Sequence, residues 1–154
     1  MRMRMQQGMK IIVASDHAGF AYKARVVAML RSQGHEVCDA GAHTAEASDY
    51  PLWIIPAAER VAMGEFNFGI VLGGSGNGEA IAANKVRGIR CALCWTPEAA
   101  ALARSHNDAN ILALGERLID FALAERIIET FLAIPFSNDE RHARRIAQLT
   151  EYER

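Results

Sequence analysis

Short apolar runs alternate with longer helical segments along most of the chain, and this alternation restricts the fold more than any other feature. Apolar runs of this length, bounded by turn residues, are typical of buried strands. Five strands are predicted: Lys10–Ser15, His35–Asp39, Phe68–Leu72, Arg90–Trp95 and Asn110–Leu114. Helices are predicted over Phe20–Gln33, Leu52–Met63, Gly78–Lys85, Glu98–Ser105, Asp120–Ala133 and Ser137–Glu153. Thr96 is expected as the N-cap of the fourth helix and Pro97 as its first residue. Strands separated by helices form βαβ units, so we expect an α/β protein with a three-layer, doubly wound, Rossmann-like sheet of five parallel strands, helices on both faces and an extra C-terminal helix.

Length and charge exclude several classes of partner. The 154 residues fit one domain, expected at residues 9–154, and residues 1–8 are expected to be a disordered N-terminal extension. That extension has no apolar stretch typical of a signal peptide. No apolar run approaches the roughly 18 residues of a membrane span. A net charge of −1 gives no global field for nucleic acid or membranes, so neither is expected as a partner.

The cysteines indicate a reducing compartment. Their number, three, argues against a disulfide framework, and a cytoplasmic location is expected. Cys91 and Cys94 form a CxxC pattern, but they lie in a predicted strand, where residues three apart face opposite sides. A pair of buried small residues is therefore favoured over a redox or metal pair.

The segment Phe68–Lys85 carries the clearest chemical signal. An apolar strand ends in four glycines within six residues (Gly73, Gly74, Gly76 and Gly78), then Glu79, then an alanine-rich helix. Glycines let a ligand approach the backbone, and the free N–H groups at a helix start attract anions. A phosphate-binding P-loop needs Lys-Ser/Thr after the last glycine, and a dinucleotide site needs G-x-G-x-x-G; neither spacing is present. A turn that only joins strand to helix remains an alternative.

Ligands of doubly wound sheets bind beyond the carboxyl ends of the strands. Three groups of polar residues are predicted on or near that edge: Asp16-His17, the glycine loop with Glu79, and His106-Asn107. Arg141 and Arg145 lie one helical turn apart and share a face, which suits a phosphate dianion. A solvated helix surface is the alternative for this arginine pair.

Seven segments, in order and spanning nearly everything from Met9 onward, resemble the ribose/galactose isomerases, the family of the type B ribose-5-phosphate isomerases. They are Ser15–Gly19, Asp49–Pro51, Gly73–Glu79, Ala82–Lys85, Arg104–Asn107, Gly115–Arg117 and Arg141–Arg145. The resemblance implies a metal-independent, cofactor-free aldose–ketose isomerase acting on a sugar phosphate. It also implies a homodimer or dimer of dimers whose active site lies at the interface.

The resemblance assigns roles by position. Glu79 resembles the catalytic base of the carboxylate-using branch, since Ser75 stands where other members carry a catalytic cysteine. His106 resembles the residue that opens the furanose ring, with Asp16 as its partner. Gly74, Ser75, Gly76, Asn77 and Gly78 resemble the anion hole, and Tyr50 and Asn107 match positions that line the substrate site. His17, Arg117, Arg141 and Arg145 match the phosphate-binding positions.

These roles agree with the chemistry of isomerisation. One base moves a proton between adjacent carbons, and the N–H donors of the glycine loop stabilise the enediolate. Ribose 5-phosphate is the expected substrate. Four- or six-carbon sugar phosphates, such as erythrose, allose or galactose phosphate, and a non-catalytic phosphosugar-binding module remain as alternatives.

Overall fold

The computed structural model describes residues 8–154, so the prediction for the N-terminal extension falls almost entirely outside the described residues. Five parallel strands form one sheet in the order β2-β1-β3-β5-β4. They are β1 (Lys10–Ser15), β2 (Glu36–Asp39), β3 (Phe68–Gly73), β4 (Cys91–Leu93) and β5 (Ile111–Gly115). The predicted doubly wound α/β fold is confirmed.

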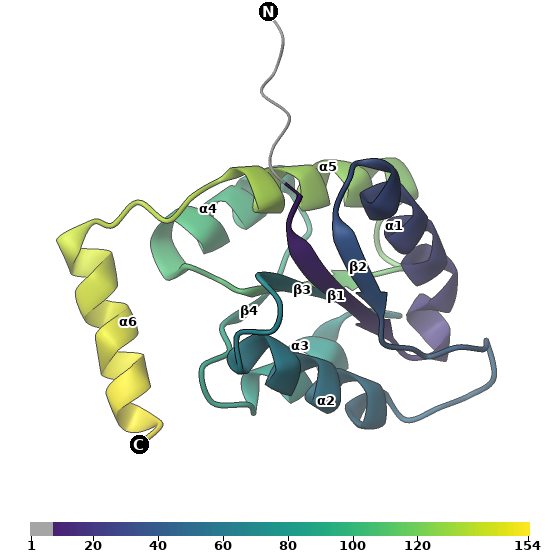
Figure 1. The fold of residues 1–154 in the computed structure, drawn as a ribbon, viewed down its shortest axis with the longest axis horizontal. Helices are drawn as coiled ribbons and strands as arrows, with labels where there is room; N and C mark the ends of the chain where they lie inside the picture. The colour runs from purple at the N-terminus through teal and green to yellow at the C-terminus, as the bar shows by residue number, and fades with distance from the viewer. Residues whose placement is uncertain (1–7) are drawn as a thin grey trace, which may run out of the picture.

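Helices cover both faces of the sheet (Figure 1). One face packs against α1 (Phe20–Ser32), α4 (Pro97–Asn107) and α5 (Phe121–Ala133), and the other against α2 (Tyr50–Ala62) and α3 (Asn77–Asn84). The strands are apolar on both sides because both sides are covered. The C-terminal helix α6 (Glu140–Tyr152) lies outside these layers and extends from the α4 side of the molecule, as Figure 1 shows. No helix in residues 8–154 has the length and apolar character needed to cross a membrane.

The two cysteines of the CxxC pattern lie on opposite faces of the sheet, as predicted. Cys94 is buried in the core under α1, α4 and α5, whereas Cys91 packs against the core under α2 and α3. Both thiols are free, and burial raises the pKa of Cys94 to about 11. The pair therefore has the character of core residues, since a reactive cysteine needs a stabilised thiolate.

The strand order reverses between β1 and β3. From β1 the chain moves outward to β2 and then returns to the other side of β1 as β3. Ser15 at the end of β1 pairs with Leu72, and Gly73 pairs with Gly115 at the end of β5. The loops that follow β1, β3 and β5 therefore meet at one place, where doubly wound proteins bind ligands.

Candidate active site

The loop after β3 contains backbone N–H groups without a hydrogen-bond acceptor in the described part of the chain. Gly76 has a φ of +82° and packs against Leu93 and the carbonyl of Leu114, where a side chain has no room. The Ser75 hydroxyl accepts the N–H of Asn77 at 3.2 Å, which fixes the turn into α3. Within residues 8–154 the N–H groups of Ser75, Gly76 and Gly78 donate to no protein acceptor. These fixed donors can bind an anion without reorganising.

Glu79 lies buried behind this loop, with 3% of its surface exposed. Its carboxyl group occupies the space that Gly73 leaves by having no side chain: a Cβ on Gly73 would overlap all three carboxyl heavy atoms. Burial raises the pKa of Glu79, because the charged form loses its hydration. A carboxylate with a raised pKa is a stronger base than an exposed glutamate.

Asp16 lies beside Glu79, at the end of β1. One of its carboxylate oxygens accepts the N–H groups of Ala18 at 2.9 Å and Gly19 at 3.2 Å, capping the short 3-10 turn η1 (His17–Gly19). Gly19 packs directly on the backbone of β3, which holds the turn against the glycine loop. After burial, the charge of Asp16 and the contact between the two carboxyl groups raise the pKa of Glu79 further.

His17 is held through one of its two ring nitrogens. Its Nδ1 accepts the N–H of Ser48 at 3.1 Å, and the Ser48 hydroxyl in turn accepts the indole N–H of Trp53. An Nδ1 that accepts a hydrogen bond leaves the proton of the neutral ring on Nε2. Nε2 is therefore a donor available to an anionic ligand.

Tyr50 and Arg117 close the two sides of the loop. A Cβ on Gly78 would lie 2.7 Å from the Tyr50 ring, and one on Gly74 would lie 3.1 Å from Nη1 of Arg117, so both side chains lie over glycines. We call the following residues the glycine-loop cluster: Asp16, His17, Tyr50, Gly73, Gly74, Ser75, Gly76, Asn77, Gly78, Glu79 and Arg117. The structure brings these predicted residues together at one edge of the sheet.

The prediction that His106 and Asn107 share this edge is wrong within a single chain. They end α4, which starts beyond the carboxyl end of β4 and returns to the amino end of β5. At a rise of about 1.5 Å per residue, an 11-residue crossover helix spans about 16 Å, so its two ends lie at opposite edges of the sheet. Arg90, just before β4, donates to the carbonyl of Asn107 at 2.8 Å and marks this amino edge.

His106 instead belongs to a second group of polar residues, between α4 and α6. Its ring stacks on that of His142 with centroids 4.2 Å apart and planes 19° apart. A cavity of about 200 Å³ is lined here by the histidine cluster, which we define as His106, Asn107, His142, Arg145, Ile146 and Leu149. Arg141 lies exposed on α6.

The sequence does not decide whether His142 neighbours the phosphate site or has no role. It is buried, and within residues 8–154 its Nε2 has no hydrogen-bond partner. Burial, followed by the nearby His106 and Arg141, lowers the pKa of His142. Its position directly after Arg141 in the arginine-rich segment is the only signal in the sequence that points to this site.

A buried arginine fixes the end of α4 and therefore His106. Arg104 donates to the carbonyls of Ile134 and Ala109 and to the Asp108 carboxylate. Its guanidinium also lies 4.8 Å from the centre of the Phe68 ring. These contacts tie α4 to β3 and to the segment after α5, so the position of His106 is set by the core.

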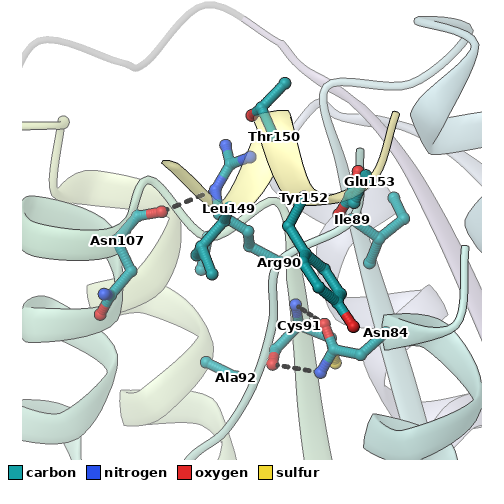
Figure 2. Close-up of a pocket in the computed structure, with 11 residues that line it drawn as sticks. Asn84, Ile89, Arg90, Cys91, Ala92, Asn107, Leu149, Thr150, Tyr152 and Glu153 are labelled. Atoms are coloured by element: carbon teal, nitrogen blue, oxygen red, sulfur yellow. Dashed lines mark hydrogen bonds between the residues drawn. The ribbon is translucent and has the colours of Figure 1, made fainter. Parts of the chain in front are cut away.

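A larger cavity, of about 470 Å³, lies at the amino edge beneath α6 (Figure 2). It is lined by apolar side chains such as Ile89 and Leu149, with Tyr152 and Arg90 at its sides. The cavity does not include the glycine loop, so this cavity and the strongest chemical signal are at opposite edges of the sheet. Within the described residues no group of three or more His, Cys, Asp or Glu side chains is arranged to hold a metal ion.

Comparison with known proteins gives consistent matches along nearly the whole chain. A family model described as Ribose/Galactose Isomerase matches residues 11–149. Ribose-5-phosphate isomerase B of Mycobacterium tuberculosis is 49% identical over 148 residues, which cover 96% of this chain and 91% of that protein. The structure of Clostridium thermocellum ribose-5-phosphate isomerase B superposes with a TM-score of 0.92 at 46% identity, covering 94% of this chain and 97% of that one. Ribose-5-phosphate isomerase B from Mycoplasma genitalium, solved with bound ribulose 5-phosphate, gives a TM-score of 0.90 at 34% identity and covers 96% and 98% of the two chains.

Proposed function

The chain belongs to the ribose/galactose isomerase family and is a sugar-phosphate isomerase, and we propose that it interconverts ribose 5-phosphate and ribulose 5-phosphate through a cis-enediolate with Glu79 as the base. One observation carries the mechanism: a buried carboxylate with a raised pKa lies directly behind a loop of unpaired N–H donors. The Mycoplasma genitalium relative is named a ribose-5-phosphate isomerase and was solved with bound ribulose 5-phosphate, which supports a five-carbon substrate.

Glu79 takes the proton from C2 of the open-chain aldose and returns it to C1. The electron pair of the broken C–H bond forms the C1–C2 double bond of the enediolate, and the carbonyl oxygen O1 becomes anionic. As C1 takes up the returned proton, the C2 hydroxyl loses its proton, O1 gains one, and O2 becomes the ketose carbonyl. The N–H groups of Ser75, Gly76 and Gly78 stabilise the anionic oxygen, and losing one such donor typically slows an enzyme about 100-fold or more. Asp16 keeps the pKa of Glu79 raised by its charge and orients a sugar hydroxyl. No step needs a metal ion.

The positions of the two clusters support a dimer as the working enzyme. In one chain Glu79 and His106 lie at opposite edges of the sheet, yet ring opening and proton transfer act on the same sugar. We propose that one subunit supplies the glycine-loop cluster and the other supplies His106, Asn107, Arg141 and Arg145. The exposed apolar side chains of α6, Leu149 and Tyr152, support this assembly, since large exposed apolar groups typically mark an interface.

In this arrangement the phosphate and the ring oxygen are held from two sides. His17 and Arg117 bind the phosphate from one subunit, and Arg141 and Arg145 bind it from the other. His106 protonates the ring oxygen as the furanose opens, a general-acid role that imidazole side chains commonly take. Free cysteines support a reducing cytoplasm as the place of this reaction.

Subunit mixing tests the assembly. Glu79→Gln and His106→Asn variants are each expected to lose most activity, because each removes one half of every site. After unfolding and refolding as an equal mixture, half of the dimers are hybrids with one intact site, so about a quarter of wild-type activity returns. A mixture that stays as inactive as its components would contradict a site shared between subunits.

The substrate is tested by turnover of four-, five- and six-carbon aldose phosphates in the presence of a chelator. We expect ribose 5-phosphate to give the highest kcat/KM and the chelator to leave it unchanged. Equal or better use of a six-carbon substrate would reassign the substrate. Proton exchange from solvent deuterium into bound sugar phosphate would separate an isomerase of any chain length from a binding module.

A further inference from the structure

The loop between β5 and α5 is held against the glycine loop by its backbone. The N–H of Glu116 donates to the carbonyl of Gly73 at 2.8 Å, and the N–H of Arg117 donates to the carbonyl of Gly74 at 3.0 Å. Gly115, just before them, packs on the backbone of Ser75 with no room for a side chain. The backbone of Arg117 is therefore fixed relative to the anion-binding donors.

The Glu116 side chain extends in the other direction, to the start of α1. Its Oε1 accepts the N–H of Tyr22 at 2.6 Å, a contact between residues 94 positions apart in the sequence. The Tyr22 hydroxyl donates to the carbonyl of Ile119 at 2.8 Å, so α1 is joined to the loop on both sides of Arg117.

The start of α1 needs such an acceptor because it has none of its own. Its N-cap is Gly19, which makes no side-chain cap, and its first turn contains no acidic residue. The first N–H groups of a helix have no intrahelical partner and carry partial positive charge, which a carboxylate stabilises. Glu116 supplies this carboxylate, and α1 directly follows the η1 turn that carries Asp16 and His17.

We propose that Glu116 is a positioning residue that fixes the spacing between Arg117 and the turn bearing His17, and thereby sets the affinity for the phosphate end of the substrate. The proposal rests on the proposed function in taking these two side chains as phosphate ligands from one subunit. Glu116 itself does not touch the ligand: its backbone bonds to the glycine loop and its side chain to α1. Loss of its carboxylate would leave each phosphate ligand intact but remove one of the two hydrogen bonds that join the Arg117 loop to α1, which follows the turn that carries His17.

The test compares three changes at Glu116 with a matched acidic cap on the same loop. Glu116→Ala removes the acceptor, Glu116→Asp shortens it by one methylene, and Glu116→Gln keeps an acceptor oxygen without the charge. Asp120 caps α5 by accepting the Leu123 N–H at 2.7 Å, so Asp120→Ala removes a helix cap that does not join the two loops. The readouts are the dissociation constant of inorganic phosphate, KM and kcat for ribose 5-phosphate, and the thermal midpoint.

Glu116→Ala is expected to weaken phosphate binding and raise KM about tenfold, as for loss of one charge-assisted hydrogen bond, while kcat changes less than about threefold. Glu116→Asp should give an intermediate loss, and Glu116→Gln should stay within about threefold of wild type. Asp120→Ala should lower the thermal midpoint and leave phosphate affinity unchanged.

The proposal is overturned if Glu116→Ala and Asp120→Ala lower the thermal midpoint alike with phosphate affinity unchanged, because Glu116 would then be only a helix cap. If Glu116→Ala does not fold, Glu116→Asp decides the question by the same phosphate measurement. Phosphate binding does not require turnover. A protein that binds phosphate in a Glu116-dependent way but does not isomerise ribose 5-phosphate would refute the proposed function and leave this inference standing.

Discussion

Gly73→Ala is expected to abolish most of the activity without unfolding the protein. A methyl group on Gly73 would occupy the position of the Glu79 carboxyl group, so base and methyl cannot both keep their places. The backbone at Gly73 is not in the left-handed region that favours glycine, so alanine is tolerated there conformationally. Because the Glu79 carboxyl is the end of a flexible side chain, it moves aside at little cost to folding.

The size of this effect follows from the overlap. To reach an ordinary van der Waals separation from the new methyl group, the carboxyl group must withdraw by about 1 Å or more. Misplacing a catalytic group by about 1 Å can slow the chemical step about 100-fold. We therefore expect kcat to fall about 100-fold, while KM changes little because the phosphate ligands are untouched.

Gly69→Ala in the same strand is the matched control. A Cβ there would lie 3.1 Å from Ile111 Cγ1 and 3.2 Å from Val61 Cγ2, so it overpacks the core far from the glycine loop. Overpacking of this kind costs about 1–3 kcal/mol of stability. The two substitutions should thus separate: Gly69→Ala loses stability and keeps kcat, whereas Gly73→Ala keeps stability and loses kcat.

The assay measures kcat and KM for ribose 5-phosphate isomerisation together with urea unfolding of each variant. Folded Gly73→Ala with kcat within about threefold of wild type would refute the reasoning, since the observed carboxyl position would then be irrelevant to the barrier. A loss of kcat in Gly69→Ala as large as that in Gly73→Ala would refute it equally, because overpacking alone would explain both.

Three further predictions concern the carboxylates of Asp16, Glu79 and Asp39. Asp16→Asn should move the acid limb of the kcat/KM profile to lower pH, because it removes a negative charge that raises the pKa of Glu79; a limb moving upward would contradict this. Glu79→Gln should raise the thermal midpoint relative to wild type, and the increase should be larger at neutral pH than at pH about 4. Folding raises the pKa of Glu79, so its ionisation destabilises the wild-type protein as pH rises from the ordinary pKa of 4.5 through the native value. Asp39→Asn should cost about 2–4 kcal/mol in urea unfolding, because Lys23, 2% exposed and 2.8 Å from both Asp39 oxygens, would be left as an uncompensated buried charge; Lys23→Met in the same background should recover part of the loss.

Elements encoded within their own span were predictable from the sequence. Thr96 caps α4 by accepting the Ala99 N–H at 3.1 Å, and Pro97 is its first residue, as predicted. The predicted start of the C-terminal helix, Ser137, is three residues too early, because α6 begins at Glu140. Asn138 has a φ of +59°, and the Ser137 hydroxyl accepts the N–H of Asp139, so these residues form a turn ahead of the helix. Side-chain hydrogen bonds decide such ends, and apolar periodicity does not report them.

The candidate site was predictable to the extent that it follows one strand end. Glu79 directly follows the glycine loop in the sequence, so their proximity was predictable. The proximity of Asp16 follows from the strand order. The position of His106 was not, because it follows from a helix that crosses the whole sheet. The hydrogen bond between Glu116 and Tyr22 joins residues 94 positions apart, and no local sequence pattern predicts it.

The glycine-loop cluster contains two carboxylates and the histidine cluster contains an arginine, and this difference in charge leads to a last prediction. In one chain Asp16 and Glu79 lie together in the interior, and their repulsion helps to raise the pKa of Glu79. If the histidine cluster of a second subunit completes the site, Arg145 brings a positive charge toward these carboxylates, which favours the ionised base. Arg145→Gln should therefore move the acid limb of the kcat/KM profile to higher pH, opposite to Asp16→Asn. An unchanged acid limb would mean that Arg145 lies farther from Glu79 than the roughly 8–10 Å over which charges interact at physiological salt. That result would contradict the proposed phosphate site shared between subunits.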